Sequence, residues 1–168
     1  MSGEMAQVAK LEVVLQAEED LYLRLREVLR REEAELIDLD PGRIAGTVEE
    51  KRLLAEEARL HEDARRVLVA GLARALGLPE RPHKLAALIE ALGDEAGRLP
   101  ELHARLTALI ASTRGLLEAN GTFADRSLRR VQDTLRMLGR AVAEPVGYGP
   151  GRERGDGVGR GRIVRAAI

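Results

Sequence analysis

Most apolar residues between Val8 and Leu36 follow one another at alternating steps of three and four positions. This spacing lines up along one stripe of an α-helix, whereas on a β-strand it would be divided between both faces. The stripe consists of Val8, Leu11, Leu15, Tyr22, Leu25, Leu29 and Leu36. Glu18 and Glu32 stand at stripe positions that would otherwise be apolar. A long first helix is therefore predicted, and packing within a bundle is favoured over a strict coiled coil.

The first helix is predicted to end in residues 38–42, because a proline there cannot continue it. Two starts fit the second helix. Either Asp40 is the N-cap with Pro41 at the first helical position, or Thr47 and Glu50 form a capping box further along. The positions that mark this helix and its end are Ile44, Val48, Leu54, Ala58, Leu68, Leu72, Leu76, Gly77 and Pro79.

A short third helix is expected over residues 85–92, and the longest apolar pattern covers residues 100–142. Asn120-Gly121 lies in the middle of this last pattern. Since a glycine costs about 1 kcal/mol relative to alanine, the helix either bends there or breaks, with Thr122 capping a new segment. Together the patterns predict an all-α fold, an elongated bundle of three to four helices: two long, one short and one long.

Residues 145–168 have a different composition, in which seven glycines alternate with five arginines. Such a segment has little apolar surface to offset the entropy lost on ordering. We therefore expect a helical domain over residues 1–144 and a disordered Gly/Arg-rich tail over residues 145–168.

Several kinds of catalytic and metal site are disfavoured by the sequence. It contains no cysteine, which excludes thiolate nucleophiles and Cys-based zinc sites. His61-Glu62 resembles the start of a zinc-protease helix, but Arg65 stands where the second histidine is needed. Acidic residues often stand three or four positions from a basic one, as Glu27 does from Arg30, which is typical of solvated ion pairs. We expect no catalytic residues, no metal site and no cofactor.

The distribution of charged and apolar residues indicates which kinds of partner the chain can bind. The tail's five arginines against two acidic residues give it a charge of +3, and the total of −1 leaves −4 for the rest of the chain. An acidic body lacks the basic face of a nucleic-acid-binding protein, so binding of nucleic acid through the tail is only a minor alternative. No secretory signal and no run of roughly 20 apolar residues is present. A cytoplasmic protein without membrane insertion is expected.

Several short patterns follow one another in a characteristic order. Lys51-Arg52-Leu53-Leu54 provides a lysine followed by paired leucines in the second helix. Asn120-Gly121-Thr122-Phe123 precedes the last apolar repeat, and Tyr148-Gly149 opens a tail that ends in the basic and apolar residues 162–167. In this order, and over nearly the whole chain, the patterns resemble the FlgN-type flagellar export chaperones.

The resemblance implies a monomeric or weakly self-associating helical chaperone that is not an enzyme. Its clients would be the hook-associated junction proteins of the flagellum, bound through their C-terminal helical segment and delivered to the export gate. It also implies that Tyr148 docks on the cytoplasmic platform of that gate. The client-binding residues that it suggests are Asn120, Phe123, Leu128, Val131, Leu135, Leu138 and Val142.

Three alternatives remain open at the level of sequence. The apolar residues from Phe123 to Val142 would be core if the last helix is covered by the others. Tyr148 would be a local cover if it folds back over the helix end. A scaffold that self-associates through the first helix is the alternative function, since a long apolar stripe also suits that role.

Overall fold

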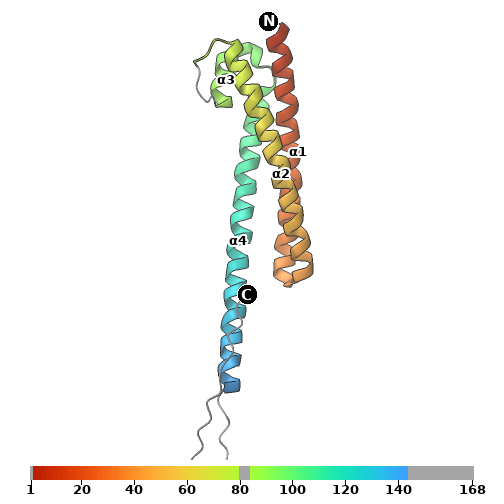
Figure 1. Cartoon of the computed structure of the whole chain (residues 1–168), viewed down its shortest axis with the longest axis vertical. Helices are drawn as coiled ribbons and strands as arrows, with labels where there is room; N and C mark the ends of the chain where they lie inside the picture. Colours follow the sequence, from red (N-terminus) through yellow and green to blue (C-terminus); the bar gives the residue numbers. More distant parts are fainter. Residues whose placement is uncertain (1, 80–83, 144–168) are drawn as a thin grey trace, which may run out of the picture. The chain divides into compact units, whose positions relative to one another are not determined.

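The computed structural model describes residues 2–79 and 84–143 (Figure 1). Its elements are α1 (Ser2–Asp38), α2 (Pro41–Ala75), α3 (Leu85–Leu92), the 3₁₀ helix η1 (Gly93–Ala96) and α4 (Leu99–Ala143). Every regular element of the described residues is helical, which confirms the all-α fold with two long helices, a short one and a long one. The expected tail over residues 145–168 lies outside the described residues.

The chain divides into two units, Met1–Arg130 and Val131–Ile168, with the boundary inside α4. The first unit holds α1, α2, α3, η1 and most of α4. In the second unit the described residues are the C-terminal turns of α4.

The turn between α1 and α2 decides between the two predicted starts of the second helix. Asp40 is the N-cap of α2, and its Oδ1 accepts hydrogen bonds from the backbone N–H groups of Gly42 (3.0 Å) and Arg43 (3.1 Å). Before it, Leu39 adopts a φ of +52°, and the Asp40 N–H donates to the carbonyl of Glu35. This bond closes a Schellman motif, in which the left-handed position is usually a glycine.

The core of the first unit lies between α1, α2, α3 and the beginning of α4. The helices α1 and α2 run side by side from their short turn, and α3 packs near the N-terminal end of α1 (Figure 1). The core is aliphatic, with Tyr22 only partly buried at its margin. Its buried members are Val8, Leu11, Leu15, Val69, Leu72, Ala73, Leu85, Leu88, Leu92, Ala96, Leu99, Leu102 and Leu106.

The chain turns from η1 into α4 at Gly97, whose φ is +56°. A Cβ at this position would come within 2.8 Å of Oε1 of Glu12, and the same oxygen accepts the N–H of Arg98 at 2.7 Å. The left-handed backbone conformation favours a glycine here, and a Cβ would in addition displace the carboxylate that accepts the Arg98 N–H. The result is a polar link between the start of α4 and α1.

The last helix is not broken at Asn120-Gly121, because α4 is continuous from Leu99 to Ala143. Thr122 accordingly lies inside the helix and does not cap a new segment. A glycine in a helix interior costs only about 1 kcal/mol. A helix of 45 residues tolerates this cost, because the residue next to the glycine is hydrogen-bonded to another helix. That neighbour, Asn120, is bonded to α1.

Candidate functional site

The burial of α4 changes along its length. In the first unit, the apolar residues from Leu99 to Leu109 are mostly buried, and Asn120 is the last buried residue of the helix among those whose side chains are described. Beyond it, Phe123 is 42% exposed and Leu128 57% exposed. The first part of α4 therefore supplies the core, while these two side chains do not belong to it.

The second unit continues this exposure. Val131, Leu135 and Leu138 follow at steps of four and three, and Leu135 and Leu138 are 62% and 56% exposed. Val142 lies in α4, but its side chain is outside the described residues, as is all of Tyr148. Of the seven residues suggested for client binding, five are exposed, one is buried and one is undescribed.

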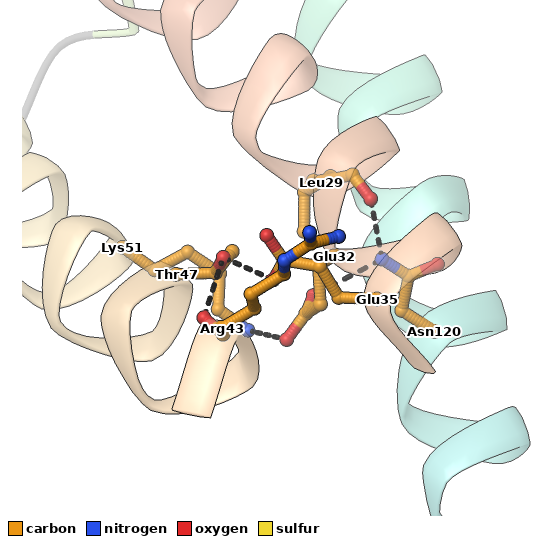
Figure 2. A network of polar contacts seen from close by, with 7 residues as sticks. All are labelled: Leu29, Glu32, Glu35, Arg43, Thr47, Lys51 and Asn120. Carbon is orange, nitrogen blue, oxygen red and sulfur yellow. Dashed lines mark hydrogen bonds and ion pairs between the residues drawn. The ribbon is translucent and has the colours of Figure 1, made fainter. Parts of the chain in front are cut away.

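Asn120 is the buried residue, and its side-chain amide points at α1 (Figure 2). Its Nδ2 donates to the carbonyl of Leu29 at 2.8 Å and to the carboxylate of Glu32 at 3.0 Å. Both donors of the amide are thus satisfied within the first unit. A side chain bonded in this way fixes the rotation of the first-unit part of α4 about its own axis against α1.

The network extends from Asn120 to α2 through Glu32 of α1, and Glu35 of the same helix makes a separate contact with α2 (Figure 2). Glu32 is buried and forms an ion pair with Lys51, so that one carboxylate joins three helices. One turn further on, Glu35 accepts a hydrogen bond from the hydroxyl of Thr47, and the carbonyl of Arg43 in α2 lies within reach of the same proton. A buried carboxylate needs such partners, since leaving it unpaired would be costly.

Glu18, the other acidic residue that interrupts the apolar stripe, is also paired with a basic residue of α2. It is buried and accepts a hydrogen bond from Nε of Arg65 in α2 at 3.0 Å. Because Glu18 and Glu32 meet basic partners and not apolar side chains, they do not weaken the packing of α1. They are interhelical polar contacts at fixed positions in an otherwise aliphatic seam.

A pocket of about 550 Å³ adjoins Asn120 in the first unit, between the end of α1 and the middle of α4. Phe123 and the exposed side chain of Ile37 contribute apolar surface to it, while Glu33, Glu118 and Arg126 contribute charge. Asn120 thus supports the wall of a pocket that Phe123 also lines. The sequence placed these two residues in one motif, and the structure brings them to one pocket.

Neither a candidate metal cluster nor a membrane-spanning helix is present among the described residues. Residues 2–79 and 84–143 contain no group of three or more His, Asp or Glu side chains able to hold a metal ion. His61 lies beside Glu57, with 3.7 Å between Nε2 and Oε1. None of the helices in these residues is both long and apolar enough to cross a membrane.

Comparison with known proteins gave one result. No curated protein and no solved structure matches the chain. The model of one protein family, described as FlgN protein, matches residues 1–154. Because that match covers most of the 168 residues, the chain belongs to the FlgN family.

Proposed function

We propose that the protein is a cytoplasmic chaperone of flagellar export that binds a helical client segment through the C-terminal part of α4 and has no enzymatic activity of its own. Membership of the FlgN family supports a role in flagellar export. The observation that carries the binding proposal is the run of exposed aliphatic side chains at helical spacing beyond Asn120. Exposed apolar side chains that follow one another along one helix are typical of a surface that a partner covers, whereas single ones are common on any surface.

The spacing of this surface suits a helical partner. Val131, Leu135 and Leu138 occupy one face of α4 in the second unit, and charged residues such as Asp133 and Arg136 occupy others. An amphipathic helix docks through side chains repeating at the same three- and four-residue steps. The clients that we propose are the C-terminal helical segments of the hook-associated junction proteins.

We propose a supporting role for Asn120 in this surface. Its two hydrogen bonds to α1 hold the first-unit part of α4, including Phe123, in one orientation. Phe123 then offers its ring at the edge of the pocket that Ile37 borders. A ring held in place loses less entropy on binding than a mobile one.

Titration calorimetry with a C-terminal fragment of a hook-associated junction protein tests the client proposal. Leu135→Ala and Leu138→Ala should weaken binding while changing the free energy of unfolding by less than about 0.5 kcal/mol, since both side chains are exposed. Met137→Ala is the matched control, because Met137 is 71% exposed but lies off the face of Leu135 and Leu138.

Two results would contradict the client proposal. One is the absence of binding by the unmodified protein at high micromolar concentration. The other is a loss of roughly 2 to 5 kcal/mol of stability in Leu135→Ala or Leu138→Ala, the value for a buried leucine, because it would place these residues in a core.

For Tyr148 we propose docking on the cytoplasmic platform of the export gate, since an aromatic residue between glycines offers a large apolar area with few rotatable bonds. Tyr148→Ala should abolish binding to the purified platform and leave both client affinity and melting temperature unchanged. Arg152→Ala, in the same segment, serves as the control. A lower melting temperature with intact platform binding would show instead that the ring covers the helix end.

Self-association is the second candidate function, favoured by apolar side chains on the outer face of the α1–α2 pair. Val13 and Val67 are largely exposed and border a groove of about 620 Å³. If this face joins two copies, sedimentation velocity should show a concentration-dependent dimer that Val67→Glu abolishes. A monomer at all concentrations would leave the chaperone function as the explanation of the fold.

A further inference from the structure

A second apolar groove, of about 530 Å³, lies within the first unit between α1, α2 and α4. It shares no residue with the proposed client surface. Each of the three helices contributes to its apolar wall, which includes Tyr22, Leu25, Ala55, Ala58, Ile110 and Leu117.

Short side chains on α2 make room for the groove. Ala55 and Ala58 stand three residues apart on one face of that helix, and their short side chains leave room that longer ones would fill. The apolar surface around this room is incompletely covered, because Val48 at one end and Leu117 on the opposite wall are about half exposed. Covering such surface favours association, because apolar area is removed from water.

The charged residues that line this groove are all basic. They are Lys51, Arg52 and Arg114, and no carboxylate lines the groove among the described residues. Lys51 is paired with Glu32, and Arg52 with Glu49 and Glu56. Arg114, on the α4 edge, is exposed and has no carboxylate partner in the part of the chain that the structure describes. That edge therefore presents a cation to any occupant.

The dimensions suit one short helix. The lining residues extend over residues 48–58 of α2 and 110–117 of α4, which at 1.5 Å per residue corresponds to about 10 to 15 Å, or two to three helical turns. A helix lying along such a groove inserts apolar side chains at steps of three and four and keeps its polar residues at the rim.

We propose that this groove binds an amphipathic α-helix of a partner protein, with an aliphatic face against Ala55 and Ala58 and acidic residues along the edge that meets Arg114. Charge complementarity at this edge selects the partner, since an acidic side chain gains a partner there and a basic one meets repulsion. The site is independent of the proposed client function, because it needs neither Leu135 nor Leu138.

Tyr22 offers a direct measurement of occupancy. The chain has no tryptophan and only two tyrosines, so Tyr148→Phe leaves Tyr22, in the groove wall, as the sole fluorophore of its kind. The probe is a synthetic helical peptide of about three turns, or 11 residues, with Leu and Ala on one face and Glu along one edge. Its matched control carries Lys in place of Glu.

The Glu peptide should change the emission of Tyr22 in a saturable manner, and the Lys peptide should bind at least about tenfold more weakly. Arg114→Glu should reverse this preference, and Ala58→Leu, which fills the groove, should abolish the response to both peptides. Leu138→Ala should bind the Glu peptide normally, which separates this site from the client surface. Far-UV circular dichroism on each variant verifies that the helices remain folded.

Equal affinity for the two peptides, or no response to either, would overturn the proposal. It would also be overturned if Leu138→Ala, rather than Ala58→Leu, removed the response, since the peptide would then occupy the end of α4. Laurate serves as a further probe: a Tyr22 response to laurate without one to the Glu peptide would show a fatty-acid site in place of a helix-binding one.

Discussion

Asn120→Asp would place a second carboxylate where the amide of Asn120 now donates to Glu32 at 3.0 Å. Two effects add. A hydrogen bond to a charged group is worth about 1.5 to 3 kcal/mol, and this is the loss expected for Asn120→Ala. Two like charges about 4 Å apart repel by a further 4 kcal/mol or so at an effective dielectric constant near 20. The ion pair of Glu32 with Lys51 offsets part of this repulsion. We therefore expect Asn120→Asp to cost more than Asn120→Ala at pH 7.

The stability lost in Asn120→Asp should also depend on pH, in a direction that follows from the charges. Two adjacent carboxylates raise the pKa of the pair in the folded state above that in the unfolded chain. The folded variant then binds more protons in acid, so its deficit relative to the unmodified protein should shrink as the pH falls from 7 to 5. Asn120→Ala introduces no titrating group, and its deficit should change less.

Urea unfolding followed by far-UV circular dichroism at both pH values measures these free energies. Gln16→Glu is the matched control, since it makes the same atomic change at an exposed position of α1 and should stay within about 0.5 kcal/mol of the unmodified protein. Equal costs for Asn120→Ala and Asn120→Asp at pH 7, with no pH dependence in either, would refute the contact between Asn120 and Glu32.

Three further predictions concern the first unit. Leu39→Gly should raise the melting temperature, because a left-handed residue other than glycine costs about 1 kcal/mol and the Leu39 side chain is mostly exposed; Leu39→Val should lower it. Asp40→Ala should lower the free energy of unfolding by about 1 kcal/mol in urea titrations, since it removes the N-cap of α2. Burial, and then the nearby charge of Glu18, raises the pKa of Tyr22. The folded protein should therefore lose stability as the pH rises above about 10, where the unfolded chain already ionises; absorbance titration of the phenol tests this, and an unshifted Tyr22 would contradict it.

Local signals in the sequence were sufficient to predict the helices. Asp40 and Pro41 mark the start of α2 because capping involves only the neighbouring backbone. The sequence did not decide whether this helix starts at Asp40 or at Thr47, because the role of Thr47 depends on a tertiary contact. Thr47 bonds to Glu35 of α1, and no local rule specifies that partner.

The polar contacts between helices could not be predicted from spacing. Glu18 and Glu32 were recognisable as exceptions in the stripe, but their partners Arg65 and Lys51 come from another helix. The Asn120 amide meets a carbonyl 91 residues away. Helical periodicity fixes which residues share a face, but it contains no information on the register between two helices.

Periodicity also does not determine how far a helix is covered. The apolar stripe of α4 continues with the same three- and four-residue steps from Leu102 to Leu138. Leu102 is buried, while Leu128 in the same unit is exposed, and the pattern alone is identical on both sides of Asn120. The sequence therefore identified the residues of the candidate site, but it did not predict which of them are exposed.

The two-residue turn between α1 and α2 has a consequence for the order in which the chain acquires its structure during synthesis. Contacts between neighbouring helices joined by a short turn form quickly, since little loop entropy is lost. The helices α1 and α2 emerge from the ribosome before α4, and the pair can close while α4 is still being translated. Until Leu102 and Leu106 arrive, however, the apolar residues Leu11 and Leu72 face water. A protein that we propose to shield the apolar helices of others thus passes through a stage in which its own apolar face has no cover.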